Sequence, residues 1–259
     1  MADLILPIRY CRIFPEPHIP PREENFRYAK LTWSLPVEET ALVLIDCWDI
    51  SRIESHLERN ERIVGERLAP VAKACRKAGI TIIHAPSPET ATKYPQWVRY
   101  AGDETLFEGD YLAPDWPPED FRGRRGDYQN YAIPREPRKA MLQRQKERSI
   151  MSALTPQPQD LVIGTGEQLH RLCRHRRILH LLYAGFAANV CVLYRDYGTR
   201  AFGKRGYNII LLRDCTSAIE AQDTLEGELL KKAAILGIEM LVGSTTTSQA
   251  LLDACEALS

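Results

Sequence analysis

The stretch from residue 181 to residue 220 constrains the fold of this chain most strongly. It begins with an apolar run at residues 181–184, which ends at Gly185 and a turn of small residues, and Cys191 then opens a helical pattern. A second apolar run follows at residues 209–212. The order strand, turn, helix, strand is typical of α/β proteins with a parallel sheet. Because a helix N-terminus stabilises a thiolate, the pattern predicts a lowered pKa for Cys191, which makes it a candidate nucleophile.

The other six cysteines are predicted to be inert, because a free thiol usually behaves as a small buried hydrophobe. Cys47 and Cys215 are the closest alternatives, since each follows an apolar strand at the end where α/β proteins place their sites. Neither has the small-residue turn that precedes Cys191. The chain has seven cysteines and no C-x-x-C spacing, so we expect reduced thiols and no structural zinc.

Composition limits the classes of partner. The 259 residues can bury one large core, which predicts a single domain over residues 1–259. Thirty-four basic and 34 acidic residues give zero formal charge, so we expect neither nucleic acid nor a membrane surface as a partner. The apolar runs are too short for a membrane span, and the first residues are too interrupted for a signal peptide, which predicts a cytoplasmic protein.

Apolar runs alternate with helical periodicity along most of the chain. The runs predict strands at residues 41–46, 81–84, 160–163, 178–183, 208–212 and 238–242, and the periodic segments predict helices at residues 62–78, 167–174, 225–236 and 248–257. This alternation predicts a three-layer α/β/α domain with a six-stranded, mostly parallel sheet. No G-x-G-x-x-G follows the first strand and no phosphate-binding G-x-x-x-x-G-K-[ST] occurs, so dinucleotide and P-loop functions lose their main support.

Two segments fall outside the alternation. Residues 1–36 are rich in proline and aromatic residues, and Pro20 and Pro21 exclude regular structure through their middle. We expect an arm that packs over the domain or over a neighbouring subunit. Residues 86–158 form a long insertion with aromatic clusters and many arginines. The insertion is either a solvated excursion with one basic helix at residues 138–149, or a lid or oligomer contact. Both segments expose apolar side chains, which predicts a homo-oligomer.

Three residues at predicted strand or turn ends are expected to meet. The carboxyl ends of parallel strands lie at one edge of a sheet, so Asp46, His84 and Cys191 converge there although they are distant in sequence. An aspartate beside a cysteine can take its proton and return it later, which suits acyl transfer through a thioester. Asp46 alone would be read as a strand-end or helix-capping carboxylate.

The motifs around these residues resemble those of a known family. The segments GFAANVCV and GYNIILLRDCTSA, within a match from about residue 41 to residue 242, are similar to the isochorismatase-like cysteine hydrolases. That family includes nicotinamidases, N-carbamoylsarcosine and ureidoacrylate amidohydrolases, biuret hydrolases and isochorismatase. The resemblance implies the isochorismatase-like fold, with a small molecule as substrate.

The resemblance also implies roles for particular residues. Cys191 would be the nucleophile and Asp46 the general base, and a cis peptide bond between Phe186 and Ala187 would aim the backbone N–H groups of Ala187 and Cys191 at an oxyanion. Trp48, His84 and Phe186 are the candidates for contacts with the substrate, with a buried core histidine as the alternative for His84.

No cofactor and no metal are expected. Some members of the family bind a metal through one aspartate and two histidines, and the candidates in this chain would be Asp49, His56 and His84. His56 lies within a charged segment and no Asp-x-His pair exists, so the sequence predicts a solvated His56 and an absent metal site.

The chain departs from the family pattern at two positions. Ala188 stands where the family has a threonine, and the loop with the catalytic lysine is missing near residues 160–169. If the chain is a hydrolase, another cation must lie close to Asp46 and Cys191. We expect it from the basic residues 122–148, at about 5 Å or less from one of the two groups. Two functions remain open: a cysteine hydrolase of a small amide, carbamoyl or ureido compound, and a non-catalytic protein that binds a small molecule or acts as an oligomeric scaffold.

Overall fold

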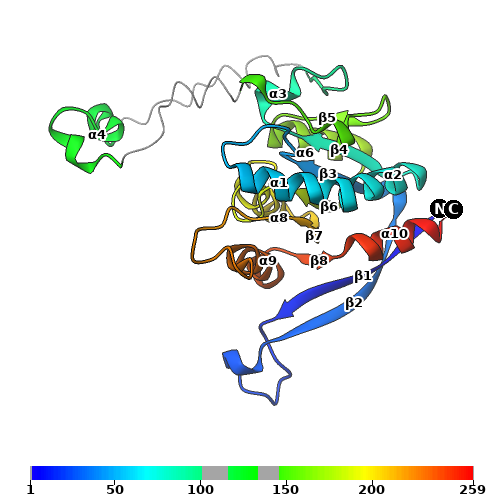
Figure 1. The fold of residues 1–259 in the computed structure, drawn as a ribbon. Helices are drawn as coiled ribbons and strands as arrows, with labels where there is room; N and C mark the ends of the chain where they lie inside the picture. The colour runs from blue at the N-terminus through cyan, green and yellow to red at the C-terminus, as the bar shows by residue number, and fades with distance from the viewer. Residues whose placement is uncertain (1, 101–115, 134–145, 259) are drawn as a thin grey trace.

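The computed structural model describes residues 2–100, 116–133 and 146–258 (Figure 1). Within these residues the sheet has eight strands in the order β2-β1-β8-β7-β6-β3-β4-β5. The six strands from β8 to β5 are parallel, while β1 is antiparallel to both β2 and β8. The strands are β1 (Asp3–Arg12), β2 (Arg27–Pro36), β3 (Thr40–Ile45), β4 (Thr81–Ala85), β5 (Leu161–Val162), β6 (His180–Gly185), β7 (Asn208–Thr216) and β8 (Ser244–Thr246).

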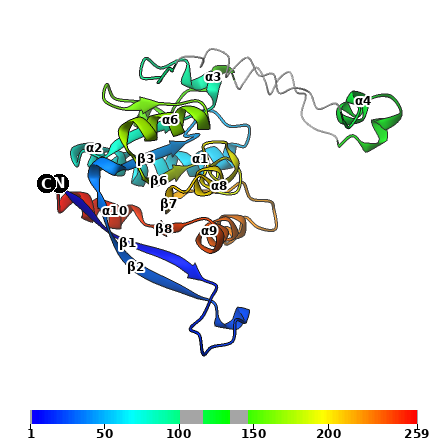
Figure 2. The same ribbon diagram turned by 180° about the vertical axis from the view of Figure 1, so that it is seen from behind.

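Helices cover both faces of the sheet. The α-helices are α1 (Glu54–Ile63), α2 (Ala69–Lys77), α3 (Pro88–Ala91), α4 (Glu119–Gly123), α6 (Gly166–Arg176), α7 (Cys191–Tyr194), α8 (Thr199–Lys204), α9 (Leu229–Leu241) and α10 (Ser248–Glu256). A π-helical segment, Val64–Leu68, joins α1 to α2. Figures 1 and 2 show α1, α2 and α10 on one face and α6, α8 and α9 on the other. No helix of the described residues has the length and hydrophobicity needed to cross a membrane.

Strand β3 lies near the middle of the sheet and is buried along its whole length. Leu42 and Leu44 pack into the core under α2 and α10, while Val43 and Ile45 pack into the core under α6, α8 and α9. A strand with apolar side chains on both faces can only exist between two helical layers. The predicted three-layer α/β/α architecture, with a mostly parallel sheet, is therefore confirmed.

Regular structure is absent around Pro20 and Pro21, as predicted, but the two ends of the N-terminal segment form strands that its composition did not indicate. Strands β1 and β2 pair from Asp3 with Pro36 to Arg12 with Arg27, and β1 continues the sheet beyond β8. Buried residues alternate with exposed ones along the first part of β1, from Leu4 to Ile8, which is the pattern of a strand with one face on the core. The prolines that suggested an arm lie in the connection between the two strands. The homo-oligomer remains a prediction.

The prediction of a strand at residues 238–242 was also wrong. Helix α9 runs to Leu241, and the sixth parallel strand is β8, three residues long. Ile235 and Ile238 are one helical turn apart and pack together in the core, so the apolar run continues a helix. Glu239 of the same helix is buried and forms an ion pair with Arg9 at 2.8 Å. A short apolar run after a helical pattern is compatible with a strand and with the end of a helix, and the buried contacts decide between the two.

Part of the insertion is described. Helix α4 and the 3₁₀ helix Gly126–Tyr131 form a small cluster in which the rings of Phe121 and Tyr128 meet edge to face at 5.2 Å. Residues 134–145, which hold most of the predicted basic helix at 138–149, lie outside the described residues. The end of the insertion returns to the core, where Ile150 bridges to Trp48 beyond the end of β3.

Candidate functional site

The carboxyl ends of β3 and β6 meet closely, and Gly185 is the reason. This residue has φ of +117°, and a Cβ atom there would lie 2.0 Å from the carbonyl oxygen of Ile45, so only glycine fits. The next residue, Phe186, donates its backbone N–H to the same oxygen at 2.9 Å. Asp46 follows Ile45 directly, and the loop with Cys191 follows Phe186. The close approach of the two strands therefore brings Asp46 next to this loop.

Asp46 is fully buried, and its carboxylate accepts hydrogen bonds from several donors. Its backbone has φ of +45°, a left-handed conformation that aspartate tolerates better than most residues. Its Oδ2 accepts a hydrogen bond from Nε of Arg195 at 3.0 Å, and the hydroxyl of Tyr197 lies 3.1 Å from its Oδ1. The Cys191 thiol donates a third hydrogen bond to this carboxylate. Asp46 and Cys191 are therefore close enough for direct proton transfer, as the sequence predicted.

The predicted lowering of the Cys191 pKa was wrong. Burial, the charge of Asp46 and the hydrogen bond to it raise the pKa of this thiol to about 12, against a smaller opposing effect of Arg195. Helix α7, which begins at Cys191, is only four residues long, so its N-terminus contributes little positive potential. The resting residue is therefore a protonated thiol beside a carboxylate.

The turn before Cys191 has the predicted backbone geometry. The peptide bond between Phe186 and Ala187 is cis. Within the described residues neither Ala187 N–H nor Cys191 N–H has a backbone acceptor, and Ala187 N–H points at the Cys191 sulfur. Ala188, which replaces the threonine of the family, donates its N–H to the carbonyl oxygen of Ser217 at 2.7 Å. A main-chain bond therefore holds the turn at this position.

The side chain of Asn189 fixes the same turn from its other end. Its amide nitrogen donates to the carbonyl of Ile219 at 3.0 Å, and its amide oxygen accepts from the N–H of Ile219 at 3.1 Å. Because both loops are tied together in this way, the two N–H groups keep their positions relative to Cys191.

A cation lies beside Asp46, and it comes from a part of the chain that the sequence did not indicate. Arg195, four residues after Cys191, forms the ion pair with Asp46. Arg148, which belongs to the expected range 122–148, also interacts electrostatically with Asp46 and Cys191. Helix α7 ends at Tyr194, and the chain turns before α8 begins at Thr199. This turn directs both Arg195 and Tyr197 to Asp46.

The ion pair between Asp46 and Arg195 changes the acidity of both groups. Burial raises the pKa of Asp46, while the Arg195 guanidinium and the hydrogen bonds from Cys191, Arg195 and Tyr197 oppose that rise. Burial favours a lower pKa for Arg195, but the adjacent carboxylate outweighs it and the pKa rises. Arg195 is therefore a permanent cation beside Asp46 and Cys191.

Asp46, Cys191 and Arg195 line one cavity of about 240 Å³. Trp48 and Phe186, two of the three candidates for substrate contacts, also line it, together with Ala187. Arg148, from the end of the insertion, is another lining residue, and its guanidinium stacks on the Trp48 ring at 4.0 Å from the centroid. The insertion therefore contributes to the site, although Arg195 is the residue that pairs with Asp46.

His56 is buried in the wall of this cavity, so the prediction of a solvated side chain was wrong. It belongs to a closed ring of three hydrogen bonds with Ser217 and Asn60. Ser217 donates to Asn60 Oδ1 at 2.5 Å, and His56 Nε2 lies 2.9 Å from Ser217 Oγ. Asn60 Nδ2 lies 3.3 Å from His56 Nδ1. This pattern requires a proton on Nε2 and none on Nδ1. Burial lowers the pKa of His56 to about 4, so the His56 imidazole is neutral near pH 7.

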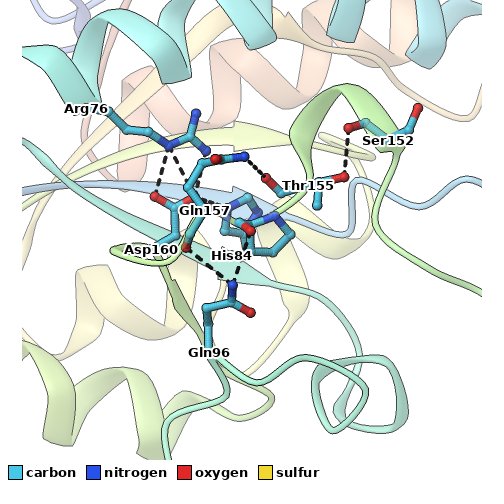
Figure 3. A network of polar contacts seen from close by, with 8 residues as sticks. Arg76, His84, Gln96, Ser152, Thr155, Gln157 and Asp160 are labelled. Carbon is cyan, nitrogen blue, oxygen red and sulfur yellow. Dashed lines mark hydrogen bonds and ion pairs between the residues drawn. The ribbon is translucent and has the colours of Figure 1, made fainter.

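His84 does not line the cavity, which does not support the predicted role in substrate binding. Its Nε2 lies 3.1 Å from Oδ2 of Asp160, which also binds Arg76 at 2.6 Å (Figure 3). The network joins α2, β4 and the segment before β5. His84 is therefore a buried core residue, the alternative that the sequence left open.

The three candidates for metal ligands are also separate. Asp49 accepts a hydrogen bond from the backbone N–H of Ser149 at 2.7 Å, while His56 and His84 belong to the two networks described above. Among the residues that the structure describes, no three His, Cys, Asp or Glu side chains form a group that could hold a metal ion.

Comparisons with known proteins agree with this arrangement. A search of curated proteins gives no match. Among solved structures, a cysteine hydrolase from Pseudomonas syringae pv. phaseolicola 1448A aligns with a TM-score of 0.58 and 19% identity, over 88% of this chain and 97% of that one. An isochorismatase from Pseudomonas putida KT2440 aligns with a TM-score of 0.49 and 14% identity, over 83% and 90% of the two chains. The model of the isochorismatase domain matches residues 40–231, which is well over half of the sequence. The chain belongs to the isochorismatase family.

Proposed function

We propose that this chain is a cysteine hydrolase that cleaves a small amide, carbamoyl or ureido compound. The observation that carries the proposal is the contact of three groups at one cavity: the Cys191 thiol, the Asp46 carboxylate bonded to it, and the Arg195 guanidinium 3.0 Å from that carboxylate. A nucleophile, a base and a fixed cation are the groups that acyl transfer requires.

The first half of the reaction forms a thioester. Asp46 takes the proton of Cys191 while the sulfur attacks the substrate carbonyl carbon, and the carbonyl electron pair moves to the oxygen. The N–H groups of Ala187 and Cys191 donate hydrogen bonds to this oxyanion. The electron pair then returns, the bond from carbon to the leaving nitrogen breaks, and protonated Asp46 gives its proton to that nitrogen. An amine or ammonia leaves, and the acyl group remains on sulfur.

The second half releases the acid. Asp46, again ionised, takes a proton from a water molecule as the water oxygen attacks the thioester carbon. The bond to sulfur breaks, and the proton on Asp46 returns to the Cys191 thiolate. Both halves use the same carboxylate, first as base and then as acid. Asp46 must therefore have a pKa that is not strongly lowered by its ion pair, so that it can both take up and release a proton. The opposing effects of burial and Arg195 on Asp46 meet this requirement.

Arg195 performs the electrostatic work that the family assigns to a lysine. A thiolate and a carboxylate side by side repel each other, so a cation in contact with Asp46 stabilises the negative charge as it passes between the two groups. The guanidinium cannot act as a proton donor at neutral pH, because its pKa is raised further above its ordinary value. We therefore assign Arg195 charge stabilisation only and leave the proton transfers to Asp46.

A screen of small amides, carbamoyl compounds and ureides tests the proposal, with release of ammonia or amine as the readout and Cys191→Ala as the negative control. We expect turnover of at least one compound by the wild type and no turnover above background by Cys191→Ala. Turnover that survives in Cys191→Ala would contradict the mechanism. No turnover of any compound by the folded wild type would favour the non-catalytic protein that binds a small molecule or acts as a scaffold.

A further inference from the structure

The charged residues that line the cavity are unbalanced. Asp46 is the one acidic side chain among the described lining residues, whereas Arg52, Arg148 and Arg195 are all basic. Arg195 is paired with Asp46, and His56 is neutral near pH 7 because its pKa is lowered to about 4. The Arg148 guanidinium therefore adds positive charge at the cavity beyond the pair formed by Asp46 and Arg195.

Arg148 has the surroundings of a ligand-binding arginine. It is half-buried, and among the described residues it has no ion-pair partner. Its Nε is buried and has no hydrogen-bond partner. Burial lowers the pKa of Arg148, the nearby cations Arg195 and Arg52 lower it further, and Asp46 and Cys191 oppose this effect. A buried guanidinium that faces other cations is costly unless an anion joins it.

Trp48 supports the same interpretation. Its indole ring stacks under the Arg148 guanidinium at 4.0 Å and fixes the plane of that group. The indole Nε1 is buried and, like Arg148 Nε, has no hydrogen-bond partner. Two unpartnered donors on two lining residues in direct contact are exceptional, since nearly all buried polar atoms are bonded. A ligand with acceptor oxygens would satisfy this part of the cavity.

We propose that Arg148, held flat on Trp48, recognises a carboxylate on the substrate, so that the enzyme hydrolyses the amide or carbamoyl group of a small acid. This inference rests on the proposed function for the position of the cleaved bond. A planar guanidinium binds a carboxylate through two parallel hydrogen bonds, which orients the substrate as well as holding it. The cavity volume of about 240 Å³ suits a small acid.

Binding to an inactive enzyme tests the subsite without turnover. Titration calorimetry on Cys191→Ala compares three acids, malonamate, succinamate and N-carbamoylglycine, each with its neutral primary amide. We expect at least one acid to bind roughly 10- to 100-fold more tightly than its amide, the range of a charge-assisted hydrogen bond. If no acid binds more tightly than its neutral amide, the proposal is overturned.

Variants of Arg148 identify the residue responsible. In the Cys191→Ala background, Arg148→Met should remove the preference for the acid, and Arg148→Lys should restore part of it. Arg200→Met is the matched control, because Arg200 is exposed on α8 and lies outside the cavity lining. Unchanged melting temperatures would show that the variants are folded. An acid preference that survives in folded Arg148→Met overturns the proposal.

Activity measurements separate this inference from the proposed function. An acid preference that depends on Arg148, together with no turnover by the wild type, would leave the subsite standing and reject the hydrolase. Turnover of an acid substrate with a kcat/KM that is unaffected by Arg148→Met would support the hydrolase and overturn the subsite.

Discussion

Two buried carboxylates of this protein lie in similar surroundings, but among the described residues Asp46 lines the cavity with Cys191 and Asp160 lies outside that lining. Asp46 binds Arg195 at 3.0 Å and contacts the Cys191 thiol, while Asp160 binds Arg76 at 2.6 Å and contacts His84. Each combines a carboxylate, an arginine and a group that can carry a proton. Asp160 also accepts a hydrogen bond from the backbone N–H of Gln157 at 2.9 Å, so three neighbouring residues hold its carboxylate (Figure 3).

The acidity of the two carboxylates shows what the difference means. Burial raises the pKa of Asp160, but hydrogen bonds from His84, Arg76 and Gln157 outweigh it and the pKa falls well below its ordinary value. The pKa of Asp46 is raised instead, because burial outweighs its partners. Asp160 is therefore a permanent anion that joins structural elements, and Asp46 is a group that can exchange a proton with a neighbour beside a cavity.

The largest expected effect comes from Asp46→Asn. Because an amide cannot take the thiol proton, we expect hydrolysis to fall by roughly 10²- to 10⁴-fold, the usual contribution of general acid–base catalysis. Steady-state kinetics with the best compound from the amide screen measures it. Activity within a factor of three of the wild type would show that Asp46 is not the base.

Asp160→Asn should affect stability instead of catalysis. The change leaves Arg76 without its counter-ion, and we expect a loss of about 3 kcal/mol in the free energy of unfolding. Urea denaturation measures the loss, and kinetics below the transition provides the contrast with Asp46→Asn. A folded Asp160→Asn enzyme that loses as much activity as Asp46→Asn would remove the distinction between the two clusters.

The stability of the wild type should decrease in acid because of the same network. The pKa of Asp160 is lower in the folded than in the unfolded state, so its stabilising effect is complete above the unfolded value of about 3.9 and disappears as the pH falls toward the folded value. The pKa of His84 is also lowered, mainly by burial, which gives the same direction. Urea midpoints measured below about pH 4 should fall more steeply for the wild type than for Asp160→Asn. Parallel curves would contradict this explanation.

A smaller effect concerns the reactivity of Cys191 in the free enzyme. With its pKa raised to about 12, alkylation by iodoacetamide should accelerate about tenfold per pH unit from pH 7 to pH 9. Asp46→Asn removes a negative neighbour, so it should lower this pKa and speed alkylation at pH 8. Peptide mapping should find Cys191 labelled before Cys47 and Cys215, because both of these are buried. A rate that does not change with pH would indicate a preformed thiolate.

The sequence predicted the parts of this molecule that depend on local patterns. The apolar run before Asp46 indicates a strand buried on both faces, and the glycine before Phe186 indicates a close backbone approach. The five predicted strands that correspond to β3, β4, β5, β6 and β7, and the pair Asp46–Cys191, were therefore correctly placed. Strands β1 and β2 were missed because prolines in their connection dominated the composition.

The rest of the site depends on contacts that no local pattern encodes. The interruption between α7 and α8 turns Arg195 and Tyr197 toward Asp46, whereas an uninterrupted helix would rotate them differently. From the sequence, His84 and His56 could each be a residue that binds a ligand or a buried core residue. Their hydrogen-bond partners, Asp160 and Ser217, are distant along the chain. The pKa of Cys191 was misjudged because burial of the thiol and the charge of Asp46, distant along the chain, outweigh the effect of a short helix.

The central claim is that Arg195 supplies the charge that the family obtains from a lysine. The most direct test is kcat of Arg195→Met and Arg195→Lys on the best compound from the screen, with Arg200→Met as the matched control. We expect Arg195→Met to lower kcat by roughly 10²- to 10³-fold, the size of one electrostatic donor in a transition state, and Arg195→Lys to recover most of that loss. A folded Arg195→Met enzyme with the kcat of the wild type would contradict the account.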